Sequence, residues 1–253
     1  MSTPLASDGT ATRPMTAEQV VEVRDAAVTC PQVREPTEGA PEYAREQVVT
    51  AIACRLLDVI VALLALVLLS PLLLVIAIAI RLDSAGPALF RQERRGWHTR
   101  RFVVNKFRTM HVDSANAEHV AYVQRLIAGD AERKDALFKL VADERVTRVG
   151  RVLRRSSLDE LPQLINVVLG EMSLVGPRPC LDYELERYPA HALGRFAVKP
   201  GITGLWQVSG RSQLGFDEMI ALDLEYAERQ SFWLDVRILL RTLPVVLLGK
   251  GAA

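Results

Sequence analysis

Cysteine is scarce in this chain of 253 residues, which contains only Cys30, Cys54 and Cys180. These positions lie far apart and match neither a disulfide framework nor a metal-binding motif, so the sequence favours a reducing compartment. Cys180 follows a Gly-Pro-Arg-Pro turn and is a candidate nucleophile. Because His191 is the only histidine nearby and no triad is apparent, we interpret Cys180 as a small structural residue instead.

The chain also lacks a large excess of charge of either sign, since its formal net charge is +1. That charge is unevenly distributed. Residues 1–47 carry four arginines and eight acidic residues, so the remainder has an excess of five positive charges. The part of the chain that follows these residues is therefore basic.

The first 47 residues have no sustained apolar period and are rich in Thr, Pro, Ala and acidic residues. This composition predicts a disordered acidic tail. So long and acidic a segment before the first apolar block is also unlike an ordinary signal peptide.

Charged residues are absent from Val59 to Ile80, a run of 22 residues flanked by Arg55, Asp58 and Arg81. A helix of this length is long enough to cross a bilayer core of about 30 Å. The centre of the run contains Ser70-Pro71, and an interior proline removes one backbone hydrogen bond and bends a helix.

Two membrane arrangements follow from this run. The helix can kink at Pro71 and cross, or it can break and return to the same face as a re-entrant hairpin, with Ser70 helping to satisfy the freed backbone groups. Hydropathy alone favours crossing. The positive-inside rule agrees, because the acidic tail would then lie outside and the arginine-rich segment inside. A buried helix in a soluble core is a third interpretation, which the length and purity of the run disfavour.

Seven basic residues and one acidic residue occur between Arg91 and Arg108, interleaved with three aromatic residues. The segments on either side of Gly96 read as short strands and predict a hairpin. A basic surface that carries aromatic side chains suits the anionic headgroups of a membrane. Nucleic acid is the competing partner, and the neighbouring apolar block argues against it.

Two adjacent carboxylates, Asp159 and Glu160, lie between arginines and a Gly-Pro-Arg-Pro turn in the stretch 154–179. A helix start is predicted here, either from Ser157, which with Glu160 fits a capping box, or nearer Asp159, because a first turn tolerates Pro162 best. A helix N-terminus and nearby guanidiniums keep a carboxylate ionised, as attack on phosphorus requires. A second carboxylate can hold a divalent cation. The stretch therefore predicts a phosphate-handling site rather than a solvated surface pair.

Two later segments each allow two interpretations. The glycine-punctuated segment 200–211 contains Trp206 and Arg211 and either lines a substrate pocket or forms an ordinary turn. The apolar segment 232–248 places Arg237 and Arg241 four residues apart. That pattern suits an interfacial amphipathic helix or a helix packed against the domain.

Four motifs in this chain occur in the order seen in bacterial sugar transferases. They are Lys106-Phe107-Arg108-Thr109-Met110, Ser157-Leu158-Asp159-Glu160-Leu161-Pro162-Gln163, Gly176-Pro177-Arg178-Pro179 and Pro200-Gly201-Ile202-Thr203-Gly204. The chain resembles this family, the monotopic polyprenyl-phosphate phosphoglycosyl transferases, over about residues 48–250. Four motifs in register are far more specific than any one of them.

The resemblance implies an α+β, mainly helical fold: a membrane-associated single catalytic domain with a re-entrant helix-break-helix anchor and interfacial amphipathic helices. The implied division is 1–47 for the disordered acidic tail, 48–82 for the re-entrant membrane helix with its break at Ser70 and Pro71, and 83–253 for the catalytic domain. This arrangement replaces the crossing helix that hydropathy favours. The expected location is the inner, cytoplasmic membrane, with the catalytic domain facing the cytoplasm.

The resemblance also implies roles for individual residues. Asp159 corresponds to a nucleophile that forms a phosphosugar intermediate, and Glu160 corresponds to the ligand of Mg2+, the expected cofactor. Three cations correspond to the residues that bind the substrate phosphates: Arg154, Arg178 and Lys106. Arg155, beside the first of these, is an alternative that the sequence leaves open.

The implied function is transfer of a sugar 1-phosphate from a UDP-sugar to polyprenyl phosphate with release of UMP, the first membrane step of polysaccharide or glycoconjugate assembly. The ending of the chain, residues 234–244, resembles the catalytic part of large members that transfer hexose phosphates, which favours a UDP-hexose. The expected partners are the UDP-sugar, polyprenyl phosphate and the lipid bilayer, without nucleic acid; a homo-oligomer is left open. The alternative is a catalytically inactive membrane adaptor of a polysaccharide assembly complex.

Overall fold

The computed structural model describes residues 40–112, 145–210 and 214–247, and it shows a mainly helical α+β fold, as predicted. Residues 1–39 of the predicted tail lie outside the described residues. The elements are α2 (Ala40–Asp83), β1 (Leu89–Arg95), η1 (Trp97–Thr99), β2 (Arg101–Phe107), α4 (Arg148–Ser156), η2 (Leu158–Glu160), α5 (Gln163–Leu169), β3 (Ser173–Val175), α6 (Asp182–Leu185), η3 (Ala190–Ala197), β4 (Gly201–Thr203), α7 (Leu205–Ser209), α8 (Phe216–Arg229) and α9 (Phe232–Leu247), where η denotes a 3-10 helix.

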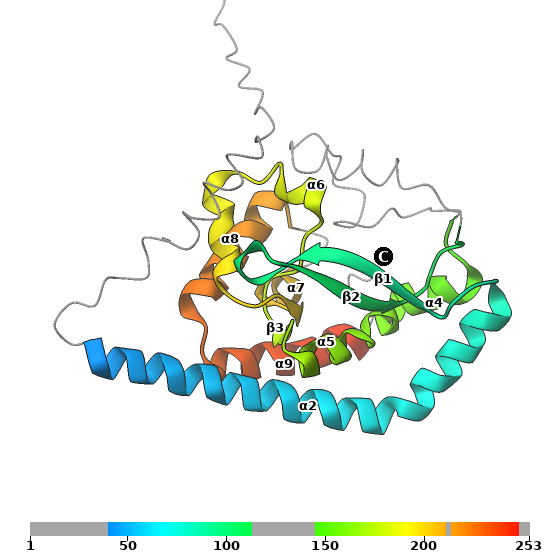
Figure 1. Ribbon diagram of the computed structural model, residues 1–253, viewed down its shortest axis with the longest axis horizontal. Helices are drawn as coiled ribbons and strands as arrows, with labels where there is room; N and C mark the ends of the chain where they lie inside the picture. The colour runs from blue at the N-terminus through cyan, green and yellow to red at the C-terminus, as the bar shows by residue number, and fades with distance from the viewer. Residues whose placement is uncertain (1–39, 113–144, 211–213, 248–253) are drawn as a thin grey trace, which may run out of the picture.

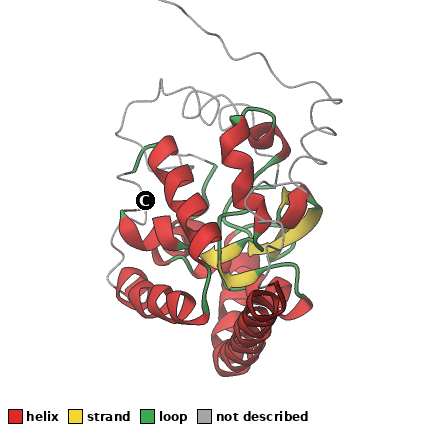
Figure 2. Cartoon of the chain, turned by 90° about the vertical axis from the view of Figure 1, so that its left-hand side faces the viewer, coloured by secondary structure: helices red, strands yellow, loops and turns green. Residues whose placement is uncertain are grey.

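The long helix α2 runs along one side of the molecule, with α5 and α9 next to it (Figure 1). Figure 2 views the same helix from its end and shows the remaining elements gathered on one side of it. Within the described part of the chain, α2 is the one helix long and apolar enough to cross a membrane. Most of its large apolar side chains are exposed, because the domain covers only one of its faces.

The predicted break at Ser70 and Pro71 is a bend in a continuous helix (Figure 1). Pro71 has no N–H, so the carbonyl of Val67, four residues earlier, loses its usual helical partner. The Ser70 Oγ donates a hydrogen bond to that carbonyl at 2.8 Å. The expected role of Ser70 is thus confirmed, and its bond explains why the helix bends without interruption.

Two charged residues before the apolar run attach the domain to α2. The Arg55 guanidinium donates to the carbonyls of Val167 and Val168 at 2.6 and 2.9 Å, at the C-terminal end of α5. The last carbonyls of a helix carry partial negative charge, so a cation there is favourable. Asp58 accepts a hydrogen bond of 2.8 Å from the backbone N–H of Leu174 in β3.

The other end of α2 is attached to the hairpin and to α4. The hairpin predicted around Gly96 is confirmed, since β1 pairs antiparallel with β2. Its basic residues do not all form a surface, because Arg94 and Arg108 are buried. Arg108 donates to the carbonyls that follow α2, and Asp83 in the last turn of α2 accepts from the Val149 N–H in α4 at 3.0 Å.

The residues around the carboxylate dyad fold differently from the predicted helix start. Ser157 ends α4 in a left-handed conformation, with φ of 58°, and makes no capping bond through its side chain. The predicted capping box is therefore wrong. Asp159 lies in η2, and α5 begins at Gln163, directly after Pro162. Proline has no backbone N–H, and the first N–H groups of a helix have no partner within the helix, so proline is well tolerated at this position.

The core lies between α2, the hairpin and the parallel pair β3 and β4. Its buried apolar residues come from several elements and are Ala62, Val104, Leu164, Val167, Met172, Leu174, Val175, Tyr226 and Ile238. A second cluster joins η3, α7 and α8 around Phe196, Trp206 and Met219.

Helix α9 combines both of the interpretations drawn from its sequence. Asp235 and Ile238 are buried against the domain. Trp233, Leu240 and Leu243 are 74%, 63% and 59% exposed. The helix therefore packs through one face and leaves an apolar face uncovered by the described residues.

Asn166, which is fully buried in α5, occupies the free edge of β2. Its Oδ1 accepts from the backbone N–H of Asn105 at 3.1 Å, and its Nδ2 donates to the Val103 carbonyl at 2.6 Å. A side chain here takes the place of a third strand, so the buried edge keeps its hydrogen bonds.

We predict that Asn166→Leu lowers the free energy of unfolding by about 2–4 kcal/mol, because two buried backbone groups of β2 lose their partners. Ile165→Leu, at the neighbouring exposed position, is the matched control and should change it by less than about 1 kcal/mol. Denaturant unfolding of the detergent-solubilised protein measures both. Equal unfolding midpoints for the two variants would contradict the bracing role of Asn166.

Candidate active site

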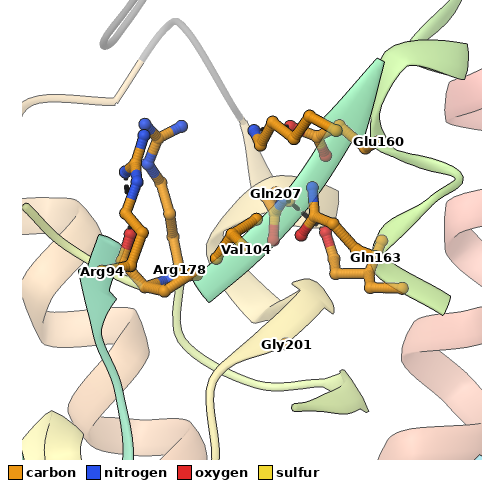
Figure 3. Close-up of a pocket in the computed structure, with 10 residues that line it drawn as sticks. Arg94, Val104, Glu160, Gln163, Arg178, Gly201 and Gln207 are labelled. Atoms are coloured by element: carbon orange, nitrogen blue, oxygen red, sulfur yellow. Dashed lines mark hydrogen bonds and ion pairs between the residues drawn. The ribbon is translucent and has the colours of Figure 1, made fainter. Parts of the chain in front are cut away.

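A hollow that is open to solvent lies between the hairpin, the dyad and the start of β4. Figure 3 shows the side chains that line it. They are Arg94, Val104, Lys106, Glu160, Gln163, Arg178, Pro179, Gly201, Ile202 and Gln207. Polar and charged side chains dominate the list, so the hollow suits an anionic, hydroxylated ligand rather than an apolar one.

The structure brings three of the predicted site residues, Lys106, Glu160 and Arg178, to this pocket. Asp159 and Arg154 are not among its lining residues, although Asp159 directly precedes Glu160 in η2. Asp159 is 7% exposed. Arg154 is partly buried in the last turn of α4, whereas Arg155 is exposed, which favours Arg154 of the two as the cation near the dyad.

Lys106 and Glu160 form an ion pair of 3.0 Å across the pocket wall, from β2 to η2. Both side chains are about four-fifths buried, at 21% and 23% exposure. The lysine therefore helps to fix the position of the Glu160 carboxylate in the pocket wall.

Arg178 lies on a turn that the neighbouring strand β4 holds in place. The Gly176 N–H donates to the Thr203 carbonyl at 2.8 Å, and the Gly201 N–H donates to the Pro177 carbonyl at 2.9 Å. A Cβ at Gly176 would collide with the Gly201 backbone, so this approach requires glycine.

The segment 200–211 contributes to the pocket through its first half. Gly201, Ile202 and Gln207 line the hollow, whereas Trp206 is buried in the core. The pocket interpretation of this segment is therefore confirmed for those residues. Arg211 lies outside the described residues.

A buried ion pair supports the turn of Arg178 from behind. Arg195 and Asp223 are each 1% exposed and lie 2.6 Å apart. The same guanidinium donates to the Arg178 carbonyl at 2.9 Å and to the Tyr188 hydroxyl at 2.6 Å. Burial raises the pKa of Asp223 to about 6, and the charge of Arg195 opposes that rise. Nothing in the sequence around Arg195 signals this role.

The sequence also failed to single out Arg94, Gln163 and Gln207, which line the pocket. Arg94 was hidden among seven basic residues of the hairpin. Burial, and then the neighbouring Arg178, lowers the pKa of its guanidinium. Gln163 and Gln207 lie inside or beside quoted motifs, but the motifs alone do not reveal which of their side chains face a cavity.

Cys180 is 1% exposed, and burial raises its thiol pKa to about 12. A thiol in this state is a poor nucleophile. Its interpretation as a small structural residue is confirmed.

The residues that can hold a metal ion are few. Among residues 40–112, 145–210 and 214–247, no group of three or more His, Cys, Asp or Glu side chains lies close enough to do so. Mg2+ needs less, because it usually binds one or two carboxylates together with substrate phosphates. Glu160 and Gln163, which both line the pocket, carry oxygen atoms of the kind that such an ion prefers.

Comparison with known proteins shows which family the sequence belongs to. Residues 49–249 match the bacterial sugar transferase family. The chain belongs to this family. The resemblance drawn from the four motifs is thereby confirmed.

Individual members of the bacterial sugar transferase family differ in length. The galactosyl transferase CpsE of Streptococcus agalactiae is 43% identical over 202 residues, which are 79% of this chain and 43% of that protein. The UDP-glucose:undecaprenyl-phosphate glucose-1-phosphate transferase of Caulobacter vibrioides is 45% identical over 207 residues, 78% of this chain and 71% of that protein. The exopolysaccharide production protein ExoY of Rhizobium meliloti is 41% identical over 201 residues, 79% of this chain and 88% of that protein. The chain thus spans less than half of some relatives and most of others.

Proposed function

We propose that this chain transfers a sugar 1-phosphate from a UDP-sugar, with UDP-hexose as the favoured donor, to polyprenyl phosphate and releases UMP. The observation that supports this proposal best is a polar pocket lined by Lys106, Arg178 and Glu160. Asp159 directly precedes Glu160 in η2. A diphosphate donor is anionic, and cations in such a pocket offset its charge. The names of the Caulobacter relative and of an undecaprenyl-phosphate galactose phosphotransferase of Salmonella typhimurium, 41% identical over 198 residues, support the same chemistry.

The reaction proceeds in two displacements. An oxygen of the Asp159 carboxylate attacks the sugar-bearing phosphorus, the bond from this phosphorus to the bridging oxygen breaks, and UMP leaves with the electron pair. A phosphate oxygen of the polyprenyl phosphate then attacks the same phosphorus. The bond to Asp159 breaks, and the carboxylate is regenerated. One site thereby serves a soluble donor and a membrane-bound acceptor in turn.

The pocket residues have distinct tasks in these steps. Arg154 and Arg178 offset the charge of the phosphates, and Lys106 orients Glu160 through their 3.0 Å ion pair. A magnesium ion bound by Glu160 supplies further positive charge at the donor diphosphate. Asp159 is buried, so little of its side chain is in contact with water.

The exposed apolar side chains support a membrane on the side of α2 and α9. Those of α2 include Leu64, Leu68 and Val75, and those of α9 include Trp233 and Leu240. We propose that α2 enters the inner leaflet and returns, so that the bend at Ser70-Pro71 lies deepest and both flanks face the cytoplasm. Reaction at the cytoplasmic face then begins polysaccharide or glycoconjugate assembly.

We expect UMP release when the protein is given UDP-hexose, Mg2+ and polyprenyl phosphate, and we expect Asp159→Asn to reduce it at least about 1,000-fold, because the amide is a poor nucleophile. Asp217→Asn, an exposed carboxylate in the first turn of α8, is the matched control. Coupled UMP detection across a panel of UDP-sugars measures the rates.

A phosphosugar should also be trapped on Asp159 by peptide mass spectrometry when the acceptor is omitted. Near-normal turnover by Asp159→Asn would sink the nucleophile assignment. A wild-type protein that releases no UMP from any donor would instead favour the inactive adaptor.

The magnesium assignment is tested separately. Excess chelator should abolish UMP release, and added Mg2+ should restore it. Glu160→Gln should raise the Mg2+ concentration for half-maximal rate by about tenfold or more and lower the maximal rate, because one charged ligand is lost. Turnover that persists in excess chelator would refute the role of the metal.

The topology is tested with the native Cys30, because Cys54 and Cys180 are buried. An impermeant maleimide should not label Cys30 in intact cells, and labelling should appear after permeabilisation. Replacing Ser70 by Leu and Pro71 by Ala removes the cause of the bend and favours a straight apolar helix of about 33 Å, long enough to cross, so this variant should become labelled from outside. The Cys30→Ser variant controls for background. Outside labelling of the wild type would refute the re-entrant arrangement without touching the chemistry.

A further inference from the structure

Arg94 presents a buried guanidinium to the pocket in a fixed orientation. It lies on β1 and is 7% exposed. Its Nε and Nη2 donate to the Gln92 Oε1 at 3.2 and 2.8 Å, and its Nη1 donates to the Pro179 carbonyl at 3.0 Å. A guanidinium held at both ends loses little freedom when it binds a ligand, so it is pre-organised for an anion.

The guanidiniums of Arg94 and Arg178 lie side by side at one side of the pocket (Figure 3). An anion that contacts both guanidiniums is attracted by two positive charges. Glu184 on α6 lies near enough to Arg94 to favour its charged form, but it does not line the pocket.

The two ends of the pocket are chemically different. Glu160, next to Asp159 in sequence, lies across the pocket from the Arg94 and Arg178 guanidiniums (Figure 3). In phosphoryl transfer the attacking and leaving oxygens are roughly in line on opposite sides of phosphorus. An attack from the side of the dyad therefore directs the leaving group toward these two arginines.

We propose that Arg94 and Arg178 together bind the phosphate that leaves with uridine. This assignment rests on the proposed function and adds Arg94 to its binding residues. When the bond from the sugar-bearing phosphorus to the bridging oxygen breaks, that oxygen keeps the electron pair and becomes part of UMP. The paired guanidiniums stabilise the negative charge that forms there.

A purely structural role for Arg94 has different consequences. Its bond to the Pro179 carbonyl also braces the turn that carries Arg178. Loss of a brace would disturb the whole nucleotide site, including contacts to the base and ribose. Loss of a residue that binds the phosphate weakens the binding of only those molecules that carry the phosphate.

The test compares UMP with uridine by titration calorimetry on the full-length protein, because the two ligands differ only in the phosphate. We expect the wild type to prefer UMP. Arg94→Gln should raise the Kd for UMP by about 10- to 100-fold and change that for uridine by less than about twofold. Arg94→Lys keeps the charge without the fork and should weaken UMP binding by less than Arg94→Gln does.

Arg91→Gln is the matched control, since Arg91 is an exposed arginine on the same strand that does not line the pocket. It should leave both Kd values unchanged. Equal weakening of UMP and uridine by Arg94→Gln would overturn the proposal in favour of a brace, as would unchanged UMP binding or a wild type that binds both ligands equally. Binding is measured without turnover, so a failure of the proposed catalysis shows separately as absent UMP release.

Discussion

The attachment of the domain to α2 through Arg55 and Asp58 is the constraint on which the rest of the structure depends. Arg55 binds carbonyls at the C-terminal end of α5, and Asp58 binds the backbone of β3. The dyad precedes α5 and the turn of Arg178 follows β3, so both walls of the pocket are placed relative to the apolar helix. The apolar helix and the pocket are thereby coupled through a few hydrogen bonds made just before the apolar run begins.

Buried arginines organise the pocket in a way that surface charge would not. Arg94, Arg108 and Arg195 each donate to main-chain carbonyls, and each is 7% exposed or less. A guanidinium carries several donors in a rigid fork, so one side chain satisfies carbonyls that regular secondary structure leaves unpaired. These hydrogen bonds hold short, irregular elements in place around the pocket.

Local patterns in the sequence predicted the features that depend on neighbouring residues. The hairpin, the apolar helix and the hydrogen bond of Ser70 follow from strand alternation, length and the missing N–H of Pro71. The capping box failed because a left-handed Ser157 ends α4 at a position where the sequence also allowed a helix start. Asn166 and Arg195 could not be predicted, since their partners lie 61 residues and 17 residues away in sequence and only the tertiary fold brings them together.

The bend in α2 is held by the domain at both of its ends. Arg55 and Asp58 hold the helix before the apolar run, and Asp83 holds it to α4 after the run. A free apolar helix answers a thinner or thicker bilayer by changing its tilt or its kink. A helix that is attached to a folded domain at two points cannot change its tilt or its bend freely. In the membrane arrangement proposed above, the curvature of α2 would therefore be set by the protein, and the surrounding lipids would adjust their packing to it.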